Sequence, residues 1–235
     1  MAGGGGLITM PALFAALPQT PPADLLGTSK VASLSGSLSA VARYARHVRF
    51  DWPLLRRAAV GAFIAALAGA WLATRVSPLR FRALVPVMLA VVLVYTLLQR
   101  DFGRGRAPHA VPYRPALTIA GAAIIGGYDG FFGPGTGSFL IFLFIATCGY
   151  DFLHASAAAK IVNCAANVAA ILVFGVTSDI HWLLGGALAV ATVLGAQVGS
   201  HLAIRRGAAF VRVVFLVVVA SLIAKTAHDA WLAAH

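Results

Sequence analysis

The amino-acid sequence predicts an all-α, polytopic membrane protein with about eight to nine transmembrane or re-entrant segments. Of its 235 residues, 60% are hydrophobic and only 11% are charged, whereas soluble domains carry about 25% charged residues. The charges are also bunched, and the stretches between them approach the ~20 apolar residues that cross a bilayer. We therefore expect the lipid bilayer to be the main environment of the chain.

The apolar runs define the predicted elements in chain order. A short glycine-led run is followed by a helix rich in small residues, two spans, a glycine-broken region, a second small-residue helix and two last apolar runs. The predicted ranges are 2–18, 24–42, 58–74, 83–99, 115–128, 139–150, 154–176, 182–204 and a run that ends near 224. The first run is short and ends in prolines, so a full crossing is not expected there.

The net charge of +11 does not indicate nucleic-acid binding, because of where the charges lie. The arginines cluster in short connections such as 43–57 and 100–114, the pattern of cytoplasmic loops, which can also contact anionic lipid. Cys148 and Cys164 lie in apolar segments and show neither disulfide nor metal-ligand spacing. We expect no nucleic-acid partner, no metal and no cofactor.

The stretch from Gly126 to Leu140 interrupts a long apolar region with glycines, one proline and a single acid, Asp129. Glycine frees the backbone and proline lacks an N–H donor, so an uninterrupted helix is not expected here. Non-helical backbone at membrane depth is tolerated only where protein or a water-filled cavity surrounds it. The break is therefore predicted to lie at a binding site between discontinuous helices.

A shift of 130 residues superimposes one half of the sequence on the other. It brings Lys30 onto Lys160, Trp52 onto Trp182, Gly69 onto Gly199, Arg82 onto Arg212, Ser33 onto Asn163 and Ser37 onto Asn167, and one further residue brings Gly6 onto Gly137. Matches of this kind indicate an internal repeat. We expect two transmembrane repeats, 1–105 and 106–235.

The charges of the loops favour an inverted arrangement of these repeats. The loop 43–57 is rich in arginine, whereas its counterpart at about 176–182 has no lysine or arginine and carries Asp179. Equivalent loops on opposite sides of the membrane are typical of inverted repeats. Three arginines count against this arrangement, because it would place them outside: Arg75, Arg80 and Arg82.

Lys30 and Lys160 are the sharpest candidates for a binding site, because both lie in apolar, small-residue helices. A lysine near the centre of a span costs about 2.5–3.5 kcal/mol on insertion scales, and such residues mark pathways. Both also lie within a turn or two of a helix start, from where a lysine can snorkel to the interface. Their match in the repeat favours the functional interpretation, in which two lysines beside broken helices bind a small anion.

The other candidate substrate-binding residues supply backbone or side-chain donors near the two glycine-rich stretches. They are Gly5, Gly6, Gly135, Thr136, Gly137, Ser138, Ser33, Asn163 and Asn167. Packing between helices explains each polar member equally well. Asp129 could pair with a lysine, titrate, cap the helix after the break or lie at the membrane interface. No histidine has a spacing that ties it to Ser138 as in a serine hydrolase, so no catalytic residue is predicted.

Two motifs resemble those of the sulfite exporter TauE/SafE family of membrane permeases. One is Tyr128-Asp129-Gly130-Phe131-Phe132-Gly133-Pro134-Gly135-Thr136-Gly137-Ser138, and the other joins Ala2-Gly3-Gly4-Gly5-Gly6-Leu7-Ile8 to Leu26-Gly27-Thr28-Ser29-Lys30. The likeness covers nearly the whole chain. Family members carry a helix before the four glycines, so we expect that this helix, with the counterpart of Asp129, is missing from the sequence as given.

The resemblance implies a multi-pass transporter of the bacterial inner membrane rather than an enzyme. Its implied substrates are small sulfur-containing anions such as sulfite or organosulfonates, usually moved by export. The alternative hypothesis is an accessory or structural membrane subunit that does not itself transport. Whether the protein forms a homo-oligomer is left open.

Overall fold

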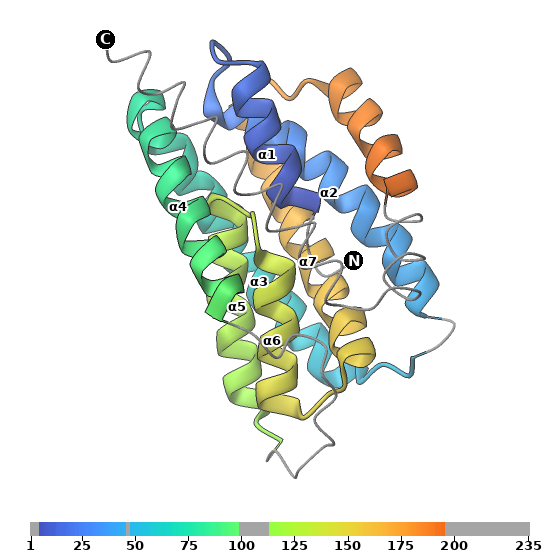
Figure 1. Cartoon of the computed structure of the whole chain (residues 1–235). Coiled ribbons are helices and arrows are strands. Elements are labelled where there is room, and N and C mark those ends of the chain that lie inside the picture. Colours follow the sequence, from blue (N-terminus) through green and yellow to red (C-terminus); the bar gives the residue numbers. More distant parts are fainter. Residues whose placement is uncertain (1–4, 46–47, 99–112, 196–235) are drawn as a thin grey trace.

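The computed structural model describes residues 5–45, 48–98 and 113–195, and this part of the chain is helical without strands. The helices are α1 (Gly5–Ala16), α2 (Pro22–Tyr44), α3 (Trp52–Arg75), α4 (Pro78–Leu98), α5 (Pro115–Phe131), α6 (Thr136–Cys148), α7 (Phe152–Thr177) and the helix Trp182–Gly195 (Figure 1). The predicted all-α fold is confirmed for these residues. The predicted run that ends near 224 and the linker at 100–112 lie outside them.

The helix boundaries follow from local capping. α3 begins earlier than predicted because Asp51 accepts a hydrogen bond from the backbone N–H of Leu54 at 3.2 Å, with proline in the first turn. Asp151 caps α7 in the same way, accepting from His154 N–H at 2.8 Å. Such caps satisfy backbone donors that have no partner within the helix. α1 is short and contains Pro11, in agreement with the expectation that this segment is not a full crossing.

Two helices of the described residues are long and apolar enough to cross a membrane, α3 and α7. α6 and Trp182–Gly195 are apolar but shorter. α2 has the length of a span, yet its many serines and glycines lower its hydropathy. Its polar residues point inward rather than to lipid, since Thr28, Ser29, Lys30 and Ser37 are all buried.

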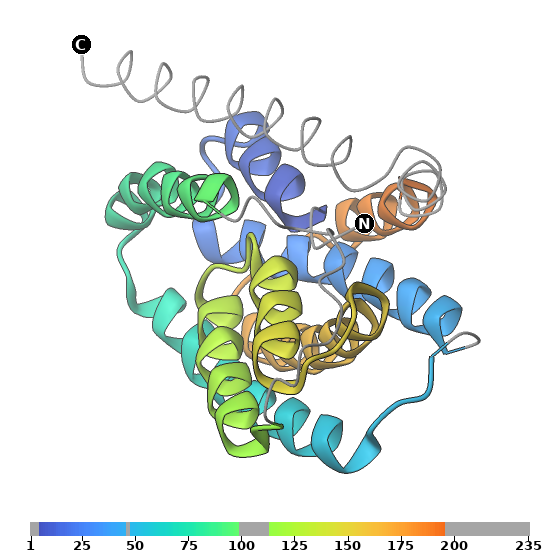
Figure 2. The same ribbon diagram turned by 60° about the horizontal axis from the view of Figure 1, so that its bottom comes forward.

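α7 lies at the centre of the bundle and packs against α2, α3, α5 and α6 (Figures 1 and 2). α2 and α7 run antiparallel, because the start of α2 lies beside the residues that follow α7. The backbone N–H of Asp179 donates to the Asp24 carboxylate at 3.1 Å, and that of His181 donates to the Thr28 hydroxyl at 3.1 Å. The middle of α2 therefore crosses the middle of α7.

α3 and α5 pack with their backbones in direct contact, through small residues. A Cβ atom built on Gly130 would lie 2.1 Å from the carbonyl oxygen of Ala66, and one on Gly126 would lie 2.6 Å from that of Ala62. Glycine allows this approach because it has no side chain. Gly126 and Gly130 lie inside α5 rather than in the break, so their role in this region is helix packing.

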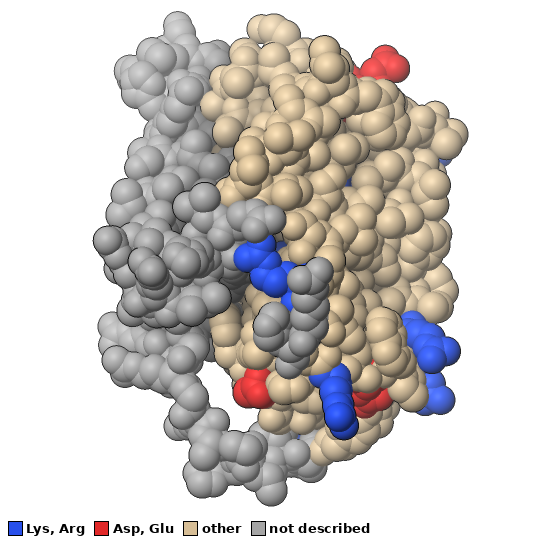
Figure 3. All heavy atoms as spheres, turned by 90° about the vertical axis from the view of Figure 1, so that its right-hand side faces the viewer, with Lys and Arg blue, Asp and Glu red and all other residues tan. Residues whose placement is uncertain are grey.

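The lateral surface of the bundle is apolar, as expected for contact with lipid. Large hydrophobic side chains are exposed on several helices, among them Ile64 of α3, Ile124 of α5, Val176 of α7 and Leu183. On the face shown in Figure 3, charged side chains lie mostly in the lower half, and most of the remaining described surface is uncharged. The large uncharged area of this face suits contact with lipid hydrocarbon, where an exposed charge is costly.

Candidate substrate site at the helix break

The predicted interruption is confirmed, and it is shorter than the glycine-rich stretch. α5 ends at Phe131 and α6 begins at Thr136. Between them, Gly133 and Gly135 have φ angles of 99° and 87°, a backbone region that side chains with a Cβ rarely adopt. Hydrogen bonds hold the turn: the Tyr128 hydroxyl donates to the Pro134 carbonyl at 2.5 Å, and the Thr136 hydroxyl donates to the Gly133 carbonyl at 2.7 Å.

Lys30 of α2 reaches the end of α5 and pairs with Asp129. Its Nζ lies 2.9 Å from Asp129 Oδ2, and both side chains are only 3% exposed. The same Nζ donates its hydrogen bond to the backbone carbonyl of Asp129, one of the carbonyls that a helix leaves unpaired at its C-terminus. The Lys30 ammonium thus forms a hydrogen bond with the backbone carbonyl of Asp129 and an ion pair with the carboxylate of the same residue. Of the roles left open for Asp129, pairing with a lysine is the one observed.

The break is shaped around this ammonium. A Cβ atom on Gly133 would lie 2.7 Å from Lys30 Nζ and 3.3 Å from both the backbone oxygen and Oδ1 of Asp129. Glycine at position 133 therefore provides both the positive φ angle and the space that the ion pair needs. This contact fastens α2 to the turn between α5 and α6.

A polar stripe runs along one side of α7, at the helical spacing of three and four residues. It consists of Ser156, Lys160, Asn163 and Asn167, of which Ser156, Asn163 and Asn167 are buried and Lys160 is partly buried. Ser37 of α2 donates to Asn163 Oδ1 at 2.9 Å, and Asn167 Nδ2 lies 3.0 Å from the same atom. These bonds join α2 to α7 where the two helices cross.

Two buried polar atoms of this stripe have no hydrogen-bond partner in the part of the chain that the structure describes, Ser156 Oγ and Asn167 Oδ1. Buried polar atoms without partners are uncommon, and each calls for an explanation such as a water or a ligand. Ser156 is not among the residues that the sequence motifs and the repeat predict for the site. Its position one helical turn before Lys160 is the signal that could have found it.

Lys160 differs from Lys30 in having no ion-pair partner among the described residues. Its side chain is partly buried, and it donates no hydrogen bond within that part of the chain. The structure therefore pairs one predicted lysine, Lys30, with Asp129 and places the other, Lys160, in the polar stripe of α7.

The remaining predicted residues divide between the two ends of the site. Gly135 precedes α6 in the left-handed conformation, and Thr136 and Gly137 are buried in its first turn, which no side chain caps. Ser138 follows and is partly buried. Gly5 and Gly6 begin α1, and Ser33 is partly buried on α2.

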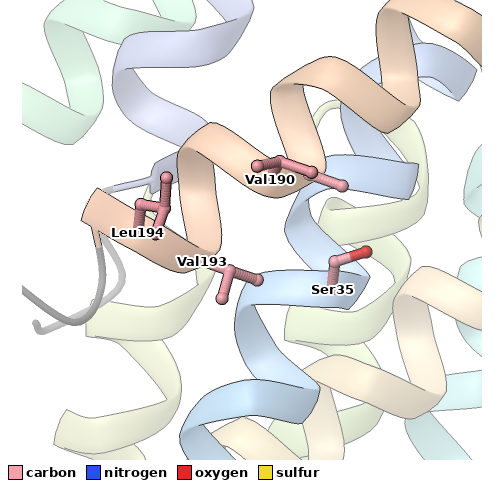
Figure 4. Close-up of a pocket in the computed structure, with 5 residues that line it drawn as sticks. Ser35, Val190, Val193 and Leu194 are labelled. Atoms are coloured by element: carbon pink, nitrogen blue, oxygen red, sulfur yellow. The ribbon is translucent and has the colours of Figure 1, made fainter.

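A groove of about 330 Å³ lies elsewhere, between α2 and the helix Trp182–Gly195. Figure 4 shows its lining residues Ser35, Val190, Val193 and Leu194. The lining includes one hydroxyl and no charged group. The groove therefore offers no charge to attract an anion, in contrast to the ion pair at the break.

An apolar helical bundle with a broken helix and a buried ion pair at the break is the arrangement expected of a membrane transporter. The comparisons with known proteins agree. The family model "Sulfite exporter TauE/SafE" matches residues 1–226, and the chain belongs to this family. The family predicted from the glycine motifs is thereby confirmed.

Several relatives extend over nearly the whole chain. The "Probable membrane transporter protein YfcA" of Escherichia coli strain K12 is 33% identical over 229 residues, which cover 97% of this chain and 84% of the relative. The "Probable membrane transporter protein ORF9" of a Sinorhizobium species is 37% identical over 223 residues, 93% of this chain and 82% of the relative. A "Probable membrane transporter protein" of Haemophilus influenzae is 29% identical over 233 residues, 97% and 89% respectively. No solved structure matches the chain.

Proposed function

We propose that this member of the TauE/SafE family is a multi-pass transporter of the bacterial inner membrane that moves small sulfur-containing anions, such as sulfite or organosulfonates. The observation that carries the proposal is the buried ion pair of Lys30 and Asp129 at the helix break, with a second lysine, Lys160, partly buried on the adjoining helix α7. The family name supplies the sulfur chemistry, and the lysines of α2 and α7 supply the preference for an anion.

The ammonium of Lys160 is the central binding group in this proposal. A partly buried charge without a counter-ion is unfavourable, and a bound anion relieves that cost. The N-terminus of α6 adds the positive end of a helix dipole. The unpaired polar atoms of Ser156 and Asn167 provide hydrogen-bonding capacity along the same side of α7.

The arrangement of helices supports two inverted repeats around this site. In inverted repeats, equivalent helices run in opposite directions across the membrane. The proposed equivalents α2 and α7 are antiparallel and meet at Ser37 and Asn163. The proposed equivalents α1 and α6 are both short, with 12 and 13 residues.

The test is anion flux in vesicles reconstituted with the full chain. We expect sulfite or methanesulfonate to be released from loaded vesicles, and Lys160→Gln to abolish the release. Arg56→Gln is the matched control, because it removes an exposed positive charge at the start of α3 and should leave flux unchanged. Normal flux in both the Lys30→Gln and Lys160→Gln proteins would refute the site. No flux in the unaltered protein, together with constant copurification of a partner, would instead support an accessory subunit.

A further inference from the structure

We infer that Lys30 serves as a built-in cation, because its ammonium fills a position for one monovalent cation that Asp129 forms at the helix break. The inference concerns the cation that holds the break together rather than the anion that is transported. Its consequence for transport, that no sodium ion is needed at this position, rests on the proposed function. Lys30 thereby acts as a positioning residue.

Two oxygen atoms of Asp129 form the position, and both attract positive charge. One is the backbone carbonyl oxygen, which accepts the hydrogen bond from Lys30 Nζ near the C-terminal end of α5. Carbonyls at this end of a helix lack partners and carry the negative end of the helix dipole. The other is Oδ2, which lies 2.9 Å from Nζ but accepts no hydrogen bond within the described residues. The carboxylate therefore holds the ammonium by its charge, an interaction that any small cation can make.

The break is narrow at this position. A Cβ atom on Gly133 would lie 2.7 Å from Lys30 Nζ and 3.3 Å from both the backbone oxygen and Oδ1 of Asp129, so even a methyl group here would crowd the cation. The side chains of Lys30 and Asp129 are each 3% exposed, so the position is closed to bulk water. Lys30 delivers its ammonium to this position from α2, 99 residues earlier in the chain.

Secondary transporters with broken helices bind sodium ions at positions of this kind, where the C-terminal ends of half-helices and unwound carbonyls face the cation. In this chain the cation at the position is covalently attached through the Lys30 side chain. A tethered group is present at a high effective concentration. A sodium ion would have to displace it and would leave the buried ammonium without a counter-ion, which is costly. We therefore expect transport that does not depend on sodium.

Chemical rescue tests the position without requiring transport. Lys30→Ala removes three carbons and the ammonium group, which n-propylammonium replaces atom for atom. The assay is the midpoint of thermal unfolding of the detergent-solubilised full chain near neutral pH, with ionic strength kept constant by N-methyl-D-glucamine chloride. We expect n-propylammonium to raise the midpoint of Lys30→Ala in a saturable manner by at least about 3 °C, because a ligand of the folded state stabilises it. 1-Propanol has the same length without the charge and should give no saturable rise.

The double variant Lys30→Ala, Asp129→Asn is the matched control, because it has the same shortened side chain at position 30 but lacks the carboxylate charge. We expect n-propylammonium to leave its midpoint unchanged. The unaltered protein should not respond either, because its own ammonium occupies the position. An absent response in Lys30→Ala, an equal response to 1-propanol or an equal response of the double variant would overturn the inference. Misfolding of Lys30→Ala even in saturating n-propylammonium would count against it too, because the position would then not accept a free cation.

Anion flux from reconstituted vesicles tests the consequence for transport. We expect the unaltered protein to release methanesulfonate equally fast in sodium chloride and in N-methyl-D-glucamine chloride. Release that requires sodium would overturn the inference while supporting the proposed function. Absence of release in both solutions would contradict the proposed function, and the rescue of Lys30→Ala would then decide the inference alone.

Discussion

Replacement of Lys30 with methionine removes an ammonium group that contacts both the carboxylate and the backbone carbonyl of Asp129. The change leaves a carboxylate that is 3% exposed without its counter-ion, and it leaves a carbonyl at the end of α5 without its donor. Removal of one partner from a buried ion pair costs about 3–5 kcal/mol. We therefore expect Lys30→Met to lower the free energy of unfolding by about 3 kcal/mol or more.

The pairing itself is measured by a double-mutant cycle with Asp129→Asn. The double variant Lys30→Met, Asp129→Asn contains neither charge, so it avoids the cost of an isolated one. We expect it to be more stable than the sum of the two single changes predicts, by about 2 kcal/mol, within the 0.5–3 kcal/mol range of coupled neighbours. The assay is reversible unfolding by a denaturing detergent in mixed micelles, followed by tryptophan fluorescence.

The control for this cycle is Lys160→Met, which makes the same chemical change at a lysine without an ion pair among the described residues. It should cost clearly less stability than Lys30→Met. Strict additivity of Lys30→Met and Asp129→Asn would contradict the pairing, because it would mean that the two charges do not stabilise each other. Equal effects at the two lysines would contradict the distinction between them.

Three further changes test the packing, the break and the cap. Gly130→Ala should prevent stable folding because its Cβ would lie 2.1 Å from an α3 carbonyl oxygen, even though alanine normally stabilises a helix by about 0.5–1 kcal/mol relative to glycine. Gly186→Ala is the control, since a Cβ at position 186 would have nothing within 4 Å. A stable Gly130→Ala protein would be incompatible with the packing of α3 on α5. Gly133→Ala should reduce stability in the same unfolding assay more than Gly149→Ala does. Both glycines have positive φ angles, but only Gly133 lies next to the ion pair. Equal losses of stability would show that backbone strain alone matters. Asp151→Ala should cost about 1 kcal/mol near neutral pH, the usual value of an N-cap, and this cost should vanish in acid. Although partial burial alone would raise the pKa of Asp151, the hydrogen bonds from His154 hold that pKa below the ordinary 3.8. The cap therefore contributes fully above pH 3.8, and its contribution is lost as the pH falls through the lower pKa of the folded state. A cost that does not change with pH in thermal unfolding would be evidence against the cap.

The position of the helix break was predictable because it depends on local properties. A helix is interrupted at Gly133, Pro134 and Gly135 by the backbone geometry of these residues themselves, and this effect does not require contacts with other helices. The use of Gly126 and Gly130 was not predictable in the same way. The sequence groups them with the break, but the structure places them inside α5 against α3. A glycine that allows a turn and one that allows close packing are the same residue in the sequence.

The two lysines show the same limit more sharply. The repeat marks Lys30 and Lys160 as equivalent, and the structure places them on the packed helices α2 and α7. Only the fold shows that Lys30 takes the carboxylate, across 99 residues of chain, and that Lys160 does not. Ser156 was not predictable either, because serine is common in such helices and its lack of a partner becomes visible only when the neighbouring helices are in place.

Sequence alone establishes that this chain is helical, apolar over long stretches, interrupted near residue 133 and a member of the TauE/SafE family. These properties follow from hydropathy, from the backbone preferences of glycine and proline, and from short motifs. All three are local, so each can be recognised in a short segment of the sequence. Which charges meet, and which charge remains unpaired, is set by tertiary packing. The physical reason is that an ion pair depends on a few ångströms between side chains of different helices, and that distance is fixed by how α2, α5 and α7 pack.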